Sequence, residues 1–511
     1  MNTPFIPEWV RSHARRSPDA PAIATPEARL SYSELAERFR VLAAHFAAAG
    51  VVAGDRVVVS LPNLVATVVA ELAIQTIGAC VVEVGNTWRA PALSAILAKT
   101  GAREAVVHAR DLRLWTDLAR QHRLRLWVVG ASISEDGAVV SESDAPSLQP
   151  HLLRLDDPAL IVYTSGSTGE PRGVVQTWRN VDANTRSIVQ FLDLTERDRA
   201  MLVLPLSYCY GRSVLQTHLF SGGSVFLDDR FMYPRAVVEA IRDEGCTNFA
   251  GVPTTFEIIR RQVDLGGVGL ARLRFVTQAG GAMAPDTVRW AREAFRPARL
   301  FIMYGQTEAT ARLSYLPPER AADKEGSIGI AVPGVELRVV DGSGAPVPDG
   351  EVGHLVARGD NVTPGYFADP EETRQILREG WLWTGDLARR DADGFLFYVG
   401  RTKDILKIDG HRVSPSEIEE AITRHPEVAE AAVVGSTEEV SGEVAAAFVV
   451  RRAGSSLTES GLRRFCLEHL APFKVPKAIA FVDALPHNES GKLLRARVAS
   501  ELLGPQAADR T

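Results

Sequence analysis

One run of eleven residues, YTSGSTGEPRG at positions 163–173, constrains the structure of this chain more than any other. Its three glycines let the backbone adopt positive φ angles and approach a ligand closely. The apolar run 159–162 precedes it and Val174 and Val175 follow, so we expect a loop between two buried strands. Backbone N–H groups, hydroxyls and one cation in such a loop are suited to wrapping a polyphosphate. The expected phosphate-binding residues are Thr164, Ser165, Gly166, Ser167, Thr168, Gly169 and Arg172.

One alternative to this interpretation stays open at this point, and another is excluded. A Gly/Ser-rich surface turn has the same composition, and Arg172 would then be a solvated surface charge. A Walker-type phosphate loop is excluded, because no Gly-Lys-Ser/Thr sequence closes the run.

Length and composition indicate an ordinary globular protein with more than one domain. The chain has 511 residues, which exceeds the size at which a single hydrophobic core usually stops growing. Its composition is 46% hydrophobic and 23% charged, and its net charge is −6. No long basic run occurs, so neither a nucleic acid nor a membrane is expected as a partner.

Cysteine usage and the N-terminal sequence favour a cytoplasmic location. The four cysteines are scattered, with no CxxC pair or metal-like spacing, which is typical of reduced thiols. The first ten residues lack a basic segment followed by an apolar one, so no signal peptide is expected. The apolar stretch 65–84 contains Glu71 and Gln75, and we interpret it as a buried helix and strand.

Helical and strand-like segments alternate along the first 280 residues. Helices are expected at 31–49, 64–77 and 91–99, and strands at 55–61 and 81–82. A second series has strands at 200–205, 218–220, 224–227, 249–252 and 275–278, with a helix at 234–244. Alternation of this kind predicts parallel sheets with helices on both faces.

The expected secondary structure changes after about residue 325. Strands are expected at 335–340, 353–357 and 395–399, separated by turns such as DGSG and DADG. Helices at 414–425 and 457–470 and strands at 428–434, 445–450 and 478–482 then predict a compact α+β domain. The expected fold class is therefore α/β: a large N-terminal domain of two α/β subdomains plus a β-rich section, with a small mobile α+β C-terminal domain.

Four further blocks accompany the 163–173 loop: YGQTE at 304–308, TGD at 384–386, GRTKDILKIDGHR at 400–412 and NESGK at 488–492. Together the five blocks resemble the signatures of the adenylate-forming superfamily, which includes acyl- and aryl-CoA synthetases, luciferases and the adenylation domains of peptide synthetases. The resemblance extends from about residue 7 to about residue 503. It implies an N-terminal AMP-binding domain at 1–402 and a mobile C-terminal domain at 403–511, with a hinge at Lys403.

The resemblance also implies a binding site for ATP and Mg²⁺. Glu308 is the implied magnesium ligand, and Thr307 the residue that contacts phosphate and the acid carboxylate; both are counted as catalytic. A carboxylate oxygen suits a hard cation. Where the family usually has Lys, this chain has Arg172, which keeps the charge and changes its shape. The implied adenosine-binding residues are Gly280, Gly281 and Ala282 by their backbone, Tyr304 by stacking on adenine, and Asp386 with Arg401 at the ribose.

Two catalytic lysines are implied in the C-terminal part. Lys492 would deliver its ammonium group to the carboxylate and the α-phosphate during adenylation, where charge develops. A rotation about Lys403 would then bring Lys407 and Gly410 to the site, where Gly410 would let a pantetheine arm pass in a thiol tunnel. Closure of this kind also excludes water from an acyl-adenylate.

The residues expected to form the acid pocket point to a flat or apolar acid. Amino-acid-activating relatives have an Asp where this chain has Cys209, a neutral thiol, so an α-amino acid is disfavoured. Met303 favours a short or aromatic acid over a long chain. Arg312 could face inward and pair with a second carboxylate or polar substituent, or lie on the rim. The expected pocket residues are Tyr208, Cys209, Tyr210, Phe249, Ala279, Met303 and Arg312.

The expected activity is activation of an aryl or short to medium acyl carboxylic acid with ATP and Mg²⁺, followed by transfer to coenzyme A. The hinge residue Lys403 and the absence of a carrier domain before residue 511 favour coenzyme A as the acceptor. A free-standing enzyme that loads a separate carrier protein is the alternative. Other adenylate chemistry, such as a luciferase-like oxidation or amide ligation, and an inactive nucleotide-binding scaffold are the remaining options.

Overall fold

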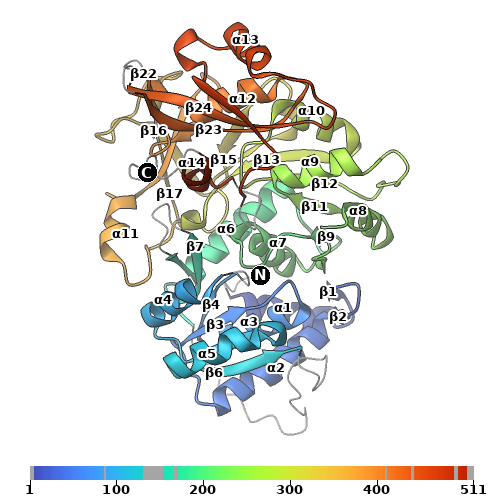
Figure 1. Ribbon diagram of the computed structural model, residues 1–511. Coiled ribbons are helices and arrows are strands. Elements are labelled where there is room, and N and C mark those ends of the chain that lie inside the picture. The colour runs from blue at the N-terminus through green and yellow to red at the C-terminus, as the bar shows by residue number, and fades with distance from the viewer. Residues whose placement is uncertain are drawn as a thin grey trace.

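The computed structural model describes residues 5–85, 88–130, 153–165, 171–408, 411–438, 442–487 and 493–502. These residues form two large sheets in the N-terminal part and two small sheets in the C-terminal part (Figure 1). The confirmed fold class is mixed α/β, with a large N-terminal and a small C-terminal domain. The 402/403 boundary, which falls between two strands, stays a prediction.

The first sheet has helices on both faces. Its order is β6-β5-β3-β4-β7-β8, parallel except for the antiparallel hairpin β7–β8. Val57 and Val59 face α2 and α3, whereas Val58 faces α4 and α5. Strands buried on both faces read as continuous apolar runs, which is why alternation is missing from the sequence here. The elements are α2 (Tyr32–Ala48), β3 (Arg56–Ser60), α3 (Val65–Thr76), β4 (Cys80–Glu83), α4 (Ala90–Thr100), β5 (Glu104–His108), α5 (Leu112–His122), β6 (Arg125–Val129), β7 (Pro158–Ser165) and β8 (Pro171–Thr177).

The second sheet joins the second α/β subdomain to the β-rich section. Its path, β16-β17-β19-β20-β15-β14-β13-β12-β11-β9-β10-β1-β2, runs unbroken from one to the other. The α/β elements are α1 (Ile6–Arg16), β1 (Pro21–Ala24), β2 (Arg29–Ser31), α6 (Trp178–Leu192), β9 (Arg199–Leu202), α7 (Cys209–Ser221), β10 (Ser224–Leu227), α8 (Pro234–Asp243), β11 (Asn248–Gly251), α9 (Pro253–Gln262), β12 (Phe275–Gln278), α10 (Pro285–Ala294) and β13 (Arg299–Tyr304). The β-rich elements are β14 (Ser314–Leu316), β15 (Ser327–Ala331), β16 (Val335–Val340), β17 (Val352–Gly359), α11 (Pro370–Ile376), β18 (Leu377–Arg378), β19 (Trp381–Arg390) and β20 (Leu396–Arg401).

The strand expected at 218–220 is wrong, because these residues belong to helix α7. Leu215 and Leu219 lie four residues apart on the buried side of that helix, a spacing that a three-residue window cannot reveal. Gly222 ends the helix in the left-handed conformation, with φ = 82°. The predicted strand at 224–227 therefore follows a helix.

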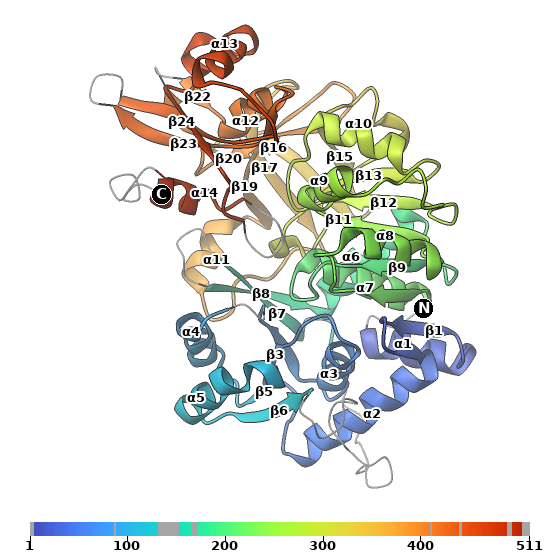
Figure 2. The same cartoon turned by 45° about the vertical axis from the view of Figure 1, so that its right-hand side comes forward.

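The C-terminal domain has its own hydrophobic core between two helices and a three-stranded sheet of order β23-β24-β25. Figures 1 and 2 show it, coloured orange to red, above the N-terminal part. Its elements are β21 (Leu406–Ile408), β22 (His411–Val413), α12 (Pro415–Thr423), β23 (Val428–Glu438), β24 (Gly442–Arg451), α13 (Glu459–His469), β25 (Ala478–Val482) and α14 (Arg495–Leu502). No helix among the described residues is long and apolar enough to cross a membrane.

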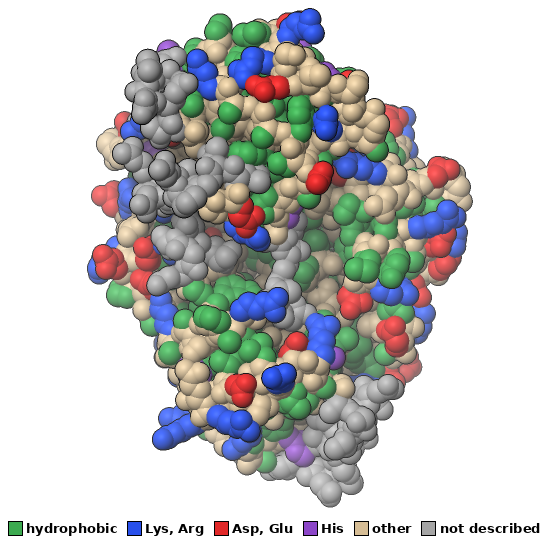
Figure 3. All heavy atoms as spheres, viewed as in Figure 1, with side chains coloured by type: hydrophobic (Ala, Val, Ile, Leu, Met, Phe, Trp, Pro, Cys, Tyr) green, Lys and Arg blue, Asp and Glu red, His purple; other side chains and the backbone are tan. Residues whose placement is uncertain are grey.

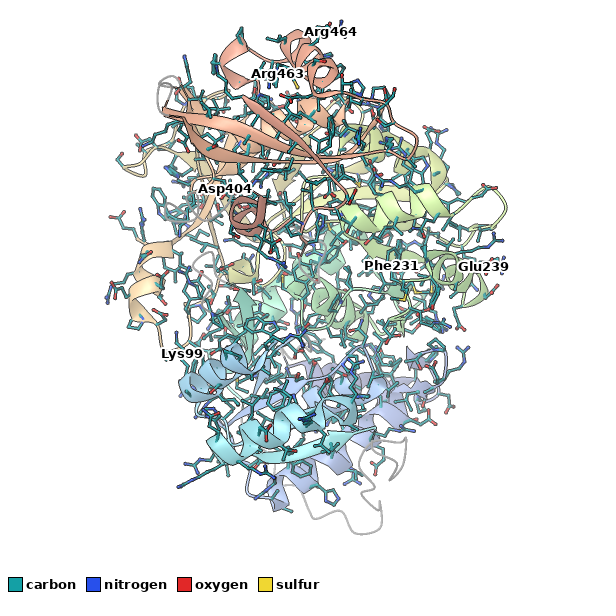
Figure 4. The ribbon with its side chains drawn as sticks, viewed as in Figure 1. Lys99, Phe231, Glu239, Asp404, Arg463 and Arg464 are labelled. Carbon is teal, nitrogen blue, oxygen red and sulfur yellow. The ribbon has the colours of Figure 1, made fainter. Side chains whose placement is uncertain are left out.

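Ionic contacts connect the separate parts of the N-terminal domain, among them those of Arg212 and Lys99. Arg212 on α7 is buried between two carboxylates of the first subdomain, with Nη2 3.0 Å from Glu71 Oε1 and 2.8 Å from Glu83 Oε2. Burial raises the pKa of the Glu83 carboxyl to about 8. At the other contact Lys99, labelled in Figure 4, lies 2.9 Å from Asp369 at the start of α11. The two sheets are thus fixed relative to each other by buried and half-buried charges.

Candidate active site

A cleft of about 3180 Å³ lies between the sheets and the C-terminal domain. Ligands of α/β proteins commonly bind beyond the carboxyl ends of the strands, and here the residues after β12 and β13 line the cleft. Most of the predicted site residues that the structure describes line this cleft: Thr164, Arg172, Tyr208, Cys209, Tyr210, Ala279, Gly280, Gly281, Ala282, Met303, Tyr304, Thr307, Glu308, Arg312, Asp386, Arg401, Lys403 and Lys407.

Several predicted residues lie outside the described residues. These are Gly166, Ser167, Thr168 and Gly169 of the phosphate loop, Gly410 of the thiol tunnel, and Lys492. For Ser165 only the backbone is described, paired with Pro171 at the end of the β7–β8 hairpin. His487 and Leu493, on either side of the segment that contains Lys492, form an antiparallel bridge and line the cleft.

The YGQTE block forms a tight turn after β13. A Cβ atom at Gly305 would lie 1.9 Å from the carbonyl oxygen of Ala311, so only glycine fits this close approach. Gln176 of β8 fixes the turn, because its amide donates to the carbonyl oxygens of Thr307 (3.3 Å) and Thr310 (3.2 Å). Thr307 and Glu308 are therefore held just beyond the carboxyl end of β13. Gln176 was not among the predicted residues, since its position 131 residues earlier carries no local signal.

Glu308 accepts a 2.8 Å hydrogen bond from the hydroxyl of Tyr366, which the sequence did not single out. Burial and the neighbouring carboxylate raise the pKa of Tyr366 above its usual value, so this hydroxyl stays protonated and donates. Among the described residues no group of three or more His, Cys, Asp or Glu side chains could hold a metal. Mg²⁺ is usually held by one or two carboxylates together with phosphates and water, so Glu308 fits a magnesium ion that arrives with ATP.

Tyr304, Asp386 and Arg401 form a connected group. The Tyr304 hydroxyl donates a 2.6 Å hydrogen bond to Asp386 Oδ2, and Arg401 Nε lies 3.1 Å from Asp386 Oδ1. Asp386 and Arg401 are paired neighbours on β19 and β20. The Asp386 carboxylate is only 2% exposed, and its backbone N–H donates to Thr384 Oγ1 at 3.1 Å. The residues that the resemblance assigns to adenine and ribose thus lie within hydrogen-bonding distance of one another.

Arg172 is not a solvated surface charge. Its Nη2 lies 2.9 Å from Glu372 of α11, and its guanidinium carbon is 5.7 Å from the centre of the Tyr366 ring. Tyr366 therefore contacts both Arg172 and Glu308. The phosphate-loop cation and the predicted magnesium ligand are thus positioned through one shared side chain.

The predicted acid pocket begins where α7 starts. The Thr307 hydroxyl lies 3.5 Å from the Cys209 thiol, and burial raises the pKa of that thiol, so it is neutral. The Tyr208 hydroxyl lies over Gly280, where an added Cβ would come within 2.8 Å of it. Tyr210 donates from its hydroxyl to the Thr277 carbonyl oxygen at 2.8 Å. Two aromatic rings and a neutral thiol therefore line this part of the cleft.

Arg312 faces inward, which resolves the alternative that the sequence left open. It is 3% exposed and lines the cleft, with its guanidinium carbon 4.0 Å from the centre of the Tyr210 ring. Its Nε donates to the Met303 sulfur at 3.4 Å. Arg312 is thus part of the pocket wall and not of its rim.

The prediction that Phe249 belongs to the acid pocket is wrong. Phe249 does not line the cleft but is fully buried in the core, where its ring centre lies 6.3 Å from that of Phe256 on α9. Side chains along a strand alternate between two faces. Ala250 faces the core that continues to the first sheet, and Phe249 faces helices α8 to α10.

The linker to the C-terminal domain also borders the cleft. Lys403 and Lys407 are exposed there, and the Lys407 backbone N–H donates to Glu443 at 2.8 Å. Asp404, labelled in Figure 4 beside α14, lies 3.7 Å from Arg495 of that helix. On the face drawn in Figure 3, side chains of both charges are interspersed.

Two family models match the chain. One, described as AMP-binding enzyme, covers residues 10–367, and the other, described as AMP-binding enzyme C-terminal domain, covers residues 417–492. The first model thus matches the N-terminal part of the structure described above, and the second matches the C-terminal part.

Individual proteins match over almost the full length. The chain is 34% identical to a feruloyl-CoA synthase of Amycolatopsis, over 98% of this chain and 99% of that protein. It is 34% identical to a sulfoacetate–CoA ligase of Cupriavidus necator, over 95% of each. A solved structure of o-succinylbenzoate coenzyme A synthetase from Bacillus subtilis, in complex with ATP and magnesium, superposes with a TM-score of 0.85 at 27% identity, over 95% of this chain and 98% of that one. The chain therefore belongs to the AMP-binding enzyme family and is an acid–thiol ligase of its adenylate-forming type.

Proposed function

We propose that the protein activates a carboxylic acid with ATP and Mg²⁺ to an acyl-AMP, and then transfers the acyl group to coenzyme A. The observation that supports this most strongly is the arrangement on one cleft wall of the Tyr304–Asp386–Arg401 group, the Thr307–Glu308 turn and Arg172. Adenosine, phosphates and a carboxylate each have a matching partner there. Relatives named as acid–CoA ligases, and one solved with ATP and magnesium, agree with these substrates and cofactors.

In the first step a carboxylate oxygen attacks the α-phosphorus, and the bond to the pyrophosphate oxygen breaks. Asp386 would accept hydrogen bonds from the ribose hydroxyls, while Tyr304 would pack on adenine. Arg172 and the 163–173 loop would hold the leaving pyrophosphate, since position and charge do most of the work in phosphoryl chemistry. Mg²⁺ at Glu308 would neutralise phosphate charge. Lys492 would stabilise the charge that develops between carboxylate and α-phosphate.

In the second step a thiol sulfur attacks the acyl carbonyl carbon, and AMP leaves with the electrons of the acyl–phosphate bond. We assign Lys403 as the hinge that exchanges the two catalytic orientations, with Lys407 and Gly410 lining the path of the thiol. Arg495 and Asp404 contact each other beside this linker, so the described C-terminal domain is already connected to the hinge by charge.

Coenzyme A is the proposed acceptor because relatives over the full length of the chain are named as CoA ligases. A carrier protein bearing the same pantetheine thiol is the alternative. The named relatives act on acids as unlike as feruloyl and sulfoacetate, so family membership leaves the acid open.

The test is acid-dependent exchange of labelled pyrophosphate into ATP, together with product analysis using free coenzyme A and a phosphopantetheinylated carrier protein. We expect exchange with a defined acid class and an acyl-CoA product. Pyrophosphate exchange together with a thioester product on the carrier protein, and none on free coenzyme A, would make the carrier protein the acceptor. Nucleotide binding without any exchange across a broad acid panel would contradict the proposed function.

A further inference from the structure

Arg312 is a buried cation without a carboxylate. It is 3% exposed, and no Asp or Glu of the described residues forms an ion pair with it. Arg212 is equally buried, yet it has Glu71 and Glu83 within ion-pair distance. Arginine is seldom fully buried unless it is paired, because removing the charge from water is costly. The cleft therefore contains a positive charge that the described residues leave uncompensated.

The contacts that Arg312 makes offset the cost of burying its positive charge only in part. The Tyr210 ring lies beneath its guanidinium at 4.0 Å, and the Met303 sulfur accepts from Nε at 3.4 Å. A ring face and a thioether are weak partners compared with an anion. Burial accordingly lowers the pKa of Arg312, with no carboxylate opposing the shift. The terminal N–H groups of its fork keep their capacity for a bidentate anion.

The backbone of Arg312 is fixed in place. Asn184 of α6 and Asn361 both donate to its carbonyl oxygen, at 3.0 and 3.1 Å, and its N–H donates to Asn184 at 3.3 Å. Both asparagines are buried. These bonds fix the backbone from which the side chain projects, and the Tyr210 ring and the Met303 sulfur hold the guanidinium, so less conformational freedom is lost when it binds an anion.

The position of Arg312 relates it to the acid. The Cys209 thiol contacts Thr307 and is close enough to Arg312 to interact with it electrostatically, and all three residues line the cleft. Thr307 is the residue assigned to the reacting carboxylate. An acid that lies beside Cys209 would therefore have its carboxylate at Thr307 and its far end at the guanidinium.

We propose that the preferred acid is short or flat and carries a second anionic group, a carboxylate or a sulfonate, which pairs with Arg312. This inference rests on the proposed function, and it names the substrate class of that same site. The two tyrosine rings would flank the body of the acid, and the neutral Cys209 thiol would contact it without adding charge.

The experiment compares matched acids that differ only in the second group. Propionate is paired with succinate and with 3-sulfopropionate, and benzoate is paired with the phthalate isomers. The kcat/KM for pyrophosphate exchange and for acyl-CoA formation is measured for each acid. In the native enzyme we expect at least one dianion to exceed its monoanionic partner by about 100-fold, equivalent to about 2.7 kcal/mol of transition-state binding.

Arg312→Met should bring that ratio close to one, because the dianion loses far more of its kcat/KM than the monoanion does, and Arg312→Lys should retain part of the preference. The matched control is Arg299→Met. Arg299 is an exposed arginine whose guanidinium lies over the ring of Phe301, and it is not among the residues that line the cleft. This substitution should leave the ratio unchanged. Thermal melting with and without AMP tests whether each variant is folded. If Arg312→Met fails to fold, the ratio is measured for Arg312→Gln, which should lose the preference, and for Arg312→Lys, which should keep part of it.

The outcomes separate the inference from the function on which it depends. Efficient turnover of monoanionic acids, with a ratio that Arg312→Met or Arg312→Gln does not change, would overturn the second-anion site and leave the ligase activity in place. Absence of exchange with every acid would overturn the proposed function, and the inference with it.

Discussion

The hydroxyl of Tyr304, at the end of β13, donates a 2.6 Å hydrogen bond to the carboxylate of Asp386 on β19. This bond joins the α/β sheet to the β-rich section at the point where we place the nucleoside. Arg401 neutralises the same carboxylate from β20. The carboxylate is thus oriented before any ligand arrives, which reduces the cost of binding.

Asp386→Ala should raise the KM for ATP by roughly 10- to 100-fold, because a hydrogen bond to a charged group contributes about 1.5–3 kcal/mol. Tyr304→Phe keeps the ring and should raise it only about threefold. Tyr233→Phe, at an exposed tyrosine, is the control. Equal ATP affinity in the native enzyme and Asp386→Ala, measured by calorimetry, would remove Asp386 from the ribose site.

Tyr366→Phe should raise the Mg²⁺ concentration needed for half-maximal pyrophosphate exchange by roughly tenfold, since the lost hydrogen bond orients a carboxylate. Coenzyme A affinity should not change. The measurement is a magnesium titration at saturating ATP. An unaltered titration would show that Glu308 is oriented without Tyr366.

Lys492→Ala should lower acyl-AMP formation by about 10²- to 10³-fold, the usual effect of removing one group that stabilises transition-state charge. Thioester formation from supplied acyl-AMP should stay close to normal. Lys474→Ala is the matched control, because Lys474 forms an ion pair with Glu417 on the C-terminal domain. Comparable losses in both half-reactions would contradict the assignment of Lys492 to adenylation alone.

Lys403→Pro should hold the C-terminal domain in one of its two orientations, because proline fixes φ. We expect one half-reaction to persist while overall turnover falls by at least tenfold. The half-reactions are measured separately, by pyrophosphate exchange and by transfer from acyl-AMP. Normal overall turnover would place the hinge elsewhere.

The Glu83 carboxyl makes stability depend on pH. Its pKa is raised from 4.5 to about 8 in the folded protein, so between these values the unfolded chain loses a proton that the folded one keeps. The free energy of unfolding therefore falls as pH rises through this window, by at most about 1.4 kcal/mol per unit, and the loss is complete above pH 8. Glu83→Gln should flatten the profile measured by urea unfolding at pH 5 to 9. Parallel profiles for the two proteins would show that Glu83 ionises normally.

Much of the site could be predicted from the sequence because the motifs are local. The YGQTE block falls at the end of β13 and the TGD block lies within β19, both on the cleft, and Cys209, Met303 and Arg312 line it. Contacts between distant segments could not be predicted. Gln176 and Tyr366 reach Thr307 and Glu308 from other elements, with no motif of their own.

The errors have equally physical causes. Phe249 lies next to cleft-forming segments, but strand alternation turns its side chain into the core. The orientation of Arg312, which the sequence left open, is a different case: its backbone is fixed by buried asparagines that are 128 and 49 residues away in the chain. No local pattern around residue 312 contains that information.

Asn184 and Asn361 hold residue 312 through its peptide group alone. The turn therefore does not depend on which side chain projects from it, and replacing arginine there leaves those three hydrogen bonds in place. The residues that we assign to the nucleotide, Tyr304, Asp386 and Arg401, are other members of the cleft lining. Under the proposed role of Arg312, a change of one codon would alter the acid that this enzyme accepts and would leave the residues assigned to ATP unchanged.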